Sequence, residues 1–159
     1  MRGKQPIRKG FPSLLMLAFL FAPSASPLFP QSKPESLYRR IGGYDAIAAV
    51  VDDLVVRMGS DPQLARFSAG FSRDSKRRRR QFLVEQLCEA AGGPCYYIGR
   101  SMKMTHEGLA ITDAEWDAVI KHLTASLDAR RVGAREKAEM LAFFSAAKAD
   151  IVGSAPGGK

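Results

Sequence analysis

Residues 44–59 read YDAIAAVVDDLVVRMG, and apolar side chains recur in this stretch at intervals of three and four residues. Such spacing places them on one face of a helix with 3.6 residues per turn, which predicts an amphipathic helix packed against a core. The glycine pair Gly42-Gly43 comes just before and permits a sharp corner after a short opening helix. The residues expected on the apolar face are Ile47, Val50, Val51, Leu54, Val55 and Met58.

Three further long helices are predicted along the chain. One covers about residues 74–91 and ends at GGP, residues 92–94, because proline cannot continue a helix. The next opens at Thr112, whose T-x-x-E spacing with Glu115 is that of a capping box. The last covers residues 134–152.

Two brief elements complete the pattern: a turn in SDPQLARF, residues 60–67, and a short helix at about residues 101–107. No convincing strand is found, so the fold class is predicted to be all-α with four substantial helices. The chain has 159 residues, of which 46% are hydrophobic and 25% charged. This composition is typical of one globular domain.

The two ends of the chain differ from this helical body. Residues 1–26 resemble a secretory signal, with basic residues followed by the apolar run Leu14–Ala22 and then by small residues. That run is shorter than the roughly 20 apolar residues that span a bilayer, so we expect export to the periplasm and no stable membrane span in the mature chain. The alternative is a disordered or membrane-tethering tail. A proline-rich linker is expected at 27–35, the folded domain at 36–152 and a flexible tail at 153–159.

The net charge of +8 is concentrated in a few places. Four of these charges lie before residue 10, and the run KRRRR occupies Lys76–Arg80. This run is compatible with a solvated helix face, with contacts to an anionic cofactor or with nucleic acid. Aromatic residues that could stack on bases are not interleaved with it, so no nucleic-acid partner is expected.

Two cysteines, Cys88 and Cys95, lie seven residues apart. In an exported protein they could form a disulfide, but two buried free thiols fit the sequence equally well. Together with two scattered histidines they do not give the ligand spacing of a zinc site. Motifs of metalloproteases, serine hydrolases, phosphate-binding loops and dinucleotide-binding folds are absent from the sequence.

His106 is the residue whose surroundings suggest chemistry. Met102 lies one helical turn before it, Tyr97 precedes the same short helix, and Trp116 and Val119 follow on the capped helix. One imidazole among large apolar and aromatic side chains suits a flat apolar ligand with a coordination site, and haem fits that description. The other histidine, His122, has small neighbours one turn away on its helix and is read as a polar-face residue.

Four segments occur in the order seen in a known family. They are LYRRIGGYDAIAAVVDDLV at 37–55, LCEAAGGPCYYIGRSM at 87–102, HEGLAIT at 106–112 and WDAV at 116–119. Together they resemble the group I truncated haemoglobins over residues 36–152. The resemblance implies a two-over-two helical sandwich around haem, with glycine pairs at its corners. These pairs are matched by Gly42, Gly43, Gly92 and Gly93.

The resemblance also implies roles for individual residues. His106 matches the proximal ligand of the haem iron, and Val55 and Leu83 stand where many members have a tyrosine and a glutamine that bind the gas ligand. Arg79 and Gln81 are the remaining polar candidates for the distal side, and Arg80 is expected to pair with the haem propionates. The residues expected to line the haem are Phe67, Leu83, Leu87, Tyr97, Met102, Trp116 and Val119.

The function implied is reversible binding of O2, and also of CO or NO, for oxygen binding or transport or for NO detoxification. An apolar distal wall would give faster oxygen release than the tyrosine–glutamine pair. NO dioxygenase or peroxidase activity would require a reductase that the sequence does not identify, so enzymatic activity is left open. The alternative is a haem-free helical module that binds anionic partners through Lys76–Arg80.

Overall fold

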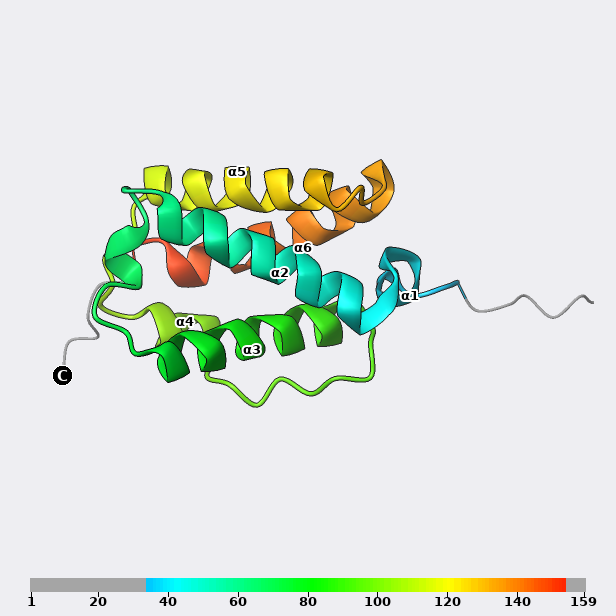
Figure 1. The fold of residues 1–159 in the computed structure, drawn as a ribbon, viewed down its shortest axis with the longest axis horizontal. Helices are drawn as coiled ribbons and strands as arrows, with labels where there is room; N and C mark the ends of the chain where they lie inside the picture. The colour runs from blue at the N-terminus through cyan, green and yellow to red at the C-terminus, as the bar shows by residue number, and fades with distance from the viewer. Residues whose placement is uncertain (1–33, 154–159) are drawn as a thin grey trace, which may run out of the picture. The chain divides into compact units, whose positions relative to one another are not determined.

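A computed structural model describes residues 34–153 and shows a helical fold (Figure 1). Within this range the only strand-like feature is an isolated parallel bridge between Ile111 and Val152. The all-α prediction is therefore confirmed. The helices expected at 44–59, 74–91 and 134–152 begin and end within one residue of those bounds, and the helix expected to open at Thr112 begins at Asp113. The elements are α1 (Leu37–Ile41), α2 (Gly43–Ser60), η1 (Ala65–Phe67), α3 (Arg73–Ala90), α4 (Met102–His106), α5 (Asp113–Ala129) and α6 (Ala134–Ile151).

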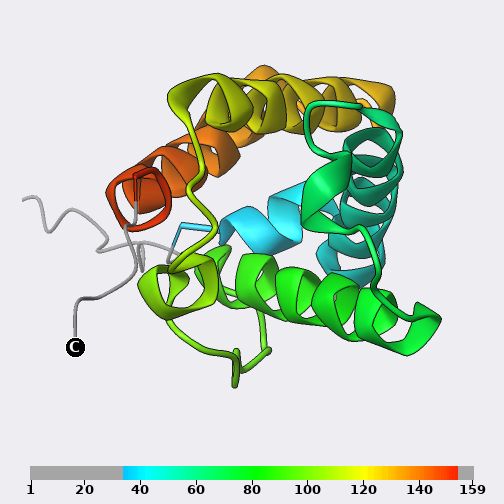
Figure 2. The same ribbon diagram turned by 90° about the vertical axis from the view of Figure 1, so that its left-hand side faces the viewer.

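Two pairs of long helices form the body of the fold. α2 packs on α3 and also on α5, and α5 packs on α6. The short helix α4 lies against α6. In Figure 2, α3 and α4 lie at one side of the ring of helices and α5 at the opposite side. This is the two-over-two arrangement that the resemblance implies.

The core forms where α2 meets its neighbours. Ile47, Val50, Val51 and Leu54 are buried, as the periodicity predicts, and Val55 is 38% exposed at the edge of that face. The partners of the α2 face come from three helices, namely Val84, Leu87 and Cys88 of α3, Leu123 and Leu127 of α5, and Met140 of α6.

Local signals begin and end these helices where the sequence indicates. Gly42 has a φ of 107° and serves both as the C-cap of α1 and as the N-cap of α2, a backbone conformation that favours glycine. At the start of α5, Thr112 accepts a hydrogen bond from the Glu115 amide while the Glu115 carboxylate accepts one from the Thr112 amide. The predicted capping box is confirmed.

The end of α3 is joined to the chain that leads into α4. Cys88 and Cys95 form a disulfide, and the Tyr38 amide donates to the carbonyl of Ala91, which ties α1 to the same point. No side chain fits at Gly93, because a Cβ there would collide with the Tyr38 ring and the Cys88 sulfur.

Several expectations concern residues that the structure does not describe. The signal segment 1–26, most of the linker 27–35 and most of the tail 153–159 lie outside the described residues. Between residues 34 and 153, no helix is both long and apolar enough to cross a membrane.

Candidate functional site

His106 is the last residue of α4, and its ring is oriented by its own helix. Ser101 caps this helix by accepting a hydrogen bond from the Met104 amide. The Nδ1 atom of His106 lies 2.8 Å from the carbonyl oxygen of Met102, one turn earlier. A neutral imidazole that donates from Nδ1 carries its lone pair on Nε2, which is the arrangement that a metal-ligating histidine needs. Within residues 34–153, the one hydrogen bond found for the ring is the bond at Nδ1.

The residues expected to line the haem come from five parts of the fold. Leu87 of α3 and Trp116 of α5 are buried, and the other five are half-buried. The structure brings Met102 to His106 within α4, and it packs the ring of Tyr97 edge-on against Phe82 of α3, with 6.1 Å between the ring centroids.

Apolar side chains also remain partly exposed near the ends of these elements. Besides Val55, they include Phe71 and Leu109, which are 43% and 39% exposed. No buried side-chain nitrogen or oxygen in the described part of the chain lacks a hydrogen-bond partner. The region thus offers one imidazole nitrogen that can bind a metal, together with apolar surface that contains no unpaired buried polar atom. The residues around His106 therefore fit haem.

The distal candidates are of two kinds: apolar residues, and polar residues that already have partners in the protein. Val55 and Leu83 offer no hydrogen-bond donor. Arg79 donates from Nη1 to the carbonyl of Phe67 at 2.9 Å, and its guanidinium lies 4.8 Å from the centroid of the Phe71 ring. Arg79 is therefore held beside the η1 region by two contacts.

Two α3 residues with expected roles toward the haem have partners within the protein. The Gln81 amide donates to the Tyr44 hydroxyl at 2.9 Å and to the Glu85 carboxylate at 3.0 Å, and its role as a distal donor stays a prediction. The Arg80 guanidinium binds the Asp52 carboxylate through Nε and Nη2 at 2.7 and 2.9 Å, and its expected pairing with propionates stays a prediction. In both cases one partner comes from α2, which the local sequence does not reveal.

The remaining histidine and the basic run have ordinary polar partners or face solvent. His122 Nε2 lies 2.7 Å from Asp61 Oδ2, and this bond lowers the pKa of the Asp61 carboxyl. In the basic run, Lys76, Arg77 and Arg78 are exposed, and Arg77 pairs with Asp74. No cluster of three or more metal-ligating side chains occurs among the described residues.

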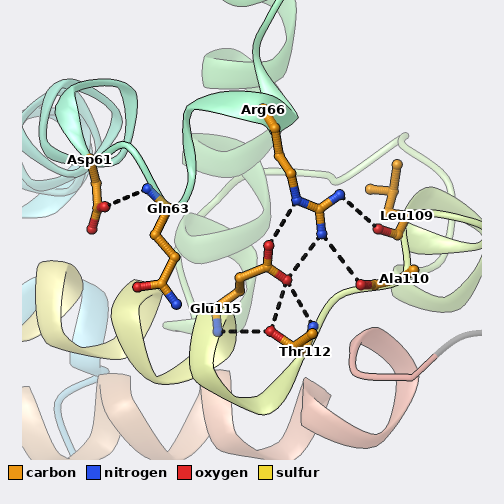
Figure 3. A network of polar contacts seen from close by, with 7 residues as sticks. All are labelled: Asp61, Gln63, Arg66, Leu109, Ala110, Thr112 and Glu115. Carbon is orange, nitrogen blue, oxygen red and sulfur yellow. Dashed lines mark hydrogen bonds and ion pairs between the residues drawn. The ribbon is translucent and has the colours of Figure 1, made fainter.

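One polar network near His106 was not anticipated. Arg66 of η1 binds both carboxylate oxygens of Glu115 in α5, at 2.8 and 3.0 Å (Figure 3). The bond with Arg66, followed by the bond from the Thr112 amide, lowers the pKa of Glu115 to about 2. The sequence identifies Glu115 as a capping residue, but no local signal relates it to an arginine 49 positions earlier.

Comparisons with known proteins agree with this geometry. Residues 36–152 match the family described as bacterial-like globin. The chain is 35% identical over 113 residues to the group 1 truncated hemoglobin GlbN of Mycolicibacterium paratuberculosis, which covers 71% of this chain and 81% of that protein. It is 39% identical over 101 residues to the GlbN of a Nostoc species, which covers 64% of this chain and 83% of that protein.

Solved structures show the same fold. The Fe(III) form of truncated hemoglobin from Tetrahymena pyriformis superposes with a TM-score of 0.69 at 23% identity, over 75% of this chain and 99% of that one. Chlamydomonas reinhardtii THB1 gives a TM-score of 0.64 at 31% identity, over 77% of this chain and all of the other.

Proposed function

This chain belongs to the bacterial-like globin family, as a group 1 truncated haemoglobin with haem as its cofactor, and we propose from that premise that His106 is the proximal ligand of the haem iron. The observation that carries the proposal is the bond between Nδ1 and the Met102 carbonyl, which leaves Nε2 available. Ferrous haem with one protein ligand supplies an open coordination position for a small gas. Haem-based gas binding is the general activity of the family, and the alternative of a haem-free module is set aside.

The distal residues support O2 as a readily released ligand, with CO and NO as further ligands. Val55 and Leu83 are apolar and donate no hydrogen bond, and the Gln81 amide is bonded to Tyr44 and Glu85. We therefore propose oxygen binding or transport with fast release. NO detoxification would in addition need an electron donor from outside the chain, a partner reductase for example.

The experiment that tests His106 is an absorption spectrum of the haem-loaded protein. His106→Ala should abolish the wild-type five- or six-coordinate spectrum, because the iron loses its protein nitrogen ligand. His122→Ala is the matched control, since His122 is bound to Asp61 and should leave the spectrum unchanged. A wild-type spectrum in His106→Ala would refute the proposal.

We also propose that the protein acts in the periplasm. Support comes from the basic and apolar pattern of residues 1–26 and from the disulfide between Cys88 and Cys95, since disulfides persist in oxidising compartments. When the whole gene is expressed and the cells are fractionated, the protein should be found in the periplasm, shortened by the length of its leader. A variant that lacks residues 2–26 should stay in the cytoplasm. Retention of the full-length product with cytoplasmic markers would contradict export.

A further inference from the structure

The segment that follows His106 is short and tightly bonded. Residues 107–112 connect α4 to α5, and within them the Leu109 amide donates to the His106 carbonyl at 3.1 Å. Ala110 has a φ of 47°, in the left-handed region that non-glycine residues rarely adopt. Such a conformation persists only where surrounding contacts hold it. The position of His106 therefore depends on what holds this segment.

Arg66 supplies contacts on one side of the segment. From η1, its Nη1 atom donates to the Leu109 carbonyl and its Nη2 atom to the Ala110 carbonyl, both at 3.3 Å (Figure 3). The same guanidinium forms the bidentate pair with Glu115, and it stacks over the Phe67 ring at 4.0 Å from the centroid. A planar guanidinium makes such a fork of bonds, which a lysine ammonium cannot reproduce.

The end of α6 holds the other side of the segment. The Gly153 amide donates to the Ile111 carbonyl at 3.0 Å, beside the bridge between Ile111 and Val152. Lys148 pairs with Asp113 at the start of α5, at 2.7 Å. Because α6 and α5 already fix residues 111–113, Arg66 is the contact that determines how residues 109 and 110 lie relative to η1.

We propose that Arg66 is a positioning residue for His106, and this inference rests on the proposed role of His106 as the proximal ligand. The path consists of two hydrogen bonds in series, from Arg66 to the Leu109 carbonyl and from the Leu109 amide to the His106 carbonyl. Through this path η1 controls where α4 ends, and thereby the angle at which the imidazole meets the haem plane. A purely stabilising ion pair would strengthen the fold without affecting that angle.

The test compares the wild type with Arg66→Ala, Arg66→Lys, Arg39→Ala and Glu115→Gln, all as haem-loaded proteins. Resonance Raman spectroscopy of the ferrous, gas-free form gives the iron–histidine stretching band, and transfer of haem to excess apomyoglobin gives the rate of haem loss. Arg66→Ala should shift and broaden the band and raise the rate of haem loss about tenfold. Arg66→Lys should shift the band in the same direction, because the charge remains but the fork is lost. Arg39→Ala removes an exposed arginine that pairs with Glu35, and as the control it should leave both measurements unchanged.

Glu115→Gln keeps the test decisive if Arg66→Ala does not load haem. It retains an oxygen that can accept from Thr112 but loses the ion pair with Arg66, so a band shift in the same direction is expected. A variant at Arg66 that melts at a lower temperature with an unchanged band and an unchanged rate of haem loss would overturn the inference. If instead the wild type has no iron–histidine band, or His106→Ala retains it, the role of His106 itself has failed.

Discussion

At the scale of single residues, the proposed distal side of the haem has two side chains that cannot donate a hydrogen bond. The resemblance leads us to expect Val55 and Leu83 at positions where many truncated haemoglobins carry polar groups. Val55 lies at the edge of the buried face of α2 and is 38% exposed, so a larger polar residue there does not enter the packed core. Oxygen affinity can therefore be changed at Val55 without rebuilding the fold.

The double variant Val55→Tyr with Leu83→Gln should release oxygen about ten- to a hundredfold more slowly. One buried hydrogen bond to the gas ligand is worth about 1–3 kcal/mol, which corresponds to one to two decades in the dissociation rate. Stopped-flow measurement of oxygen dissociation tests this expectation. Val56→Tyr, at the next position on α2 and 67% exposed, is the control and should release oxygen as the wild type does. A wild type already as slow as the double variant would contradict the proposed apolar distal wall.

At the scale of elements, the start of α5 combines helix capping with a tertiary ion pair. Glu115 is only 8% exposed and accepts from the Thr112 amide while it binds Arg66. The sequence alone indicates the capping half of this arrangement. The other half comes from η1, which supplies Arg66 and covers the Glu115 carboxylate. η1 lies near α5 only in the folded chain.

This arrangement predicts a dependence of stability on pH. The pKa of Glu115 is lowered from 4.5 to about 2 in the folded protein, so the charged form stabilises the fold fully above pH 4.5. That contribution is lost as the pH falls from 4.5 towards about 2. Glu115→Gln should therefore be less stable than the wild type at pH 7, and the difference should shrink on acidification through this range.

Urea unfolding at a series of pH values measures this difference. Glu35→Gln, in an exposed pair next to α1, serves as the control and should give a free energy of unfolding close to that of the wild type at pH 7. A difference between wild type and Glu115→Gln that stays constant down to pH 2 would show that the charge of Glu115 contributes nothing.

At the scale of the whole molecule, covalent and ionic links join elements that are distant in sequence. The disulfide fastens the end of α3 to the chain that leads into α4, which connects the expected distal helix to the segment before His106. Arg40 of α1 binds Glu136 and Glu139 of α6, so the first and last helices are also joined. Both links lie at the end of the fold where α1 meets the end of α3, since the Tyr38 amide also bonds the Ala91 carbonyl.

Removing the disulfide by the double variant Cys88→Ser with Cys95→Ser should lower the free energy of unfolding by about 2–3 kcal/mol, because the unfolded chain gains the entropy of a small open loop. Urea denaturation with and without dithiothreitol measures the effect. Reductant should destabilise the wild type by a similar amount and leave the double variant unaffected. Equal stability of oxidised and reduced wild type would contradict this expectation.

The sequence by itself determined the helices, their ends and the identity of the candidate ligand. Apolar spacing, Gly42 and the Thr112–Glu115 box act over one or two turns, so their effects can be predicted from neighbouring residues. The resemblance added the haem and the role expected for His106, through motifs that are themselves contiguous. These parts depend on short-range physics or on short patterns.

Only the tertiary structure decided which polar side chains meet across elements. Arg80 finds Asp52, Gln81 finds Tyr44 and Arg66 finds Glu115, over separations of 28, 37 and 49 residues. Each pairing depends on how two helices cross and which rotamers their packing allows, and no local pattern carries that information. The hydrogen bond at Nδ1 of His106 forms within its own helix, whereas the contacts that hold the segment beside it exist only in the assembled fold.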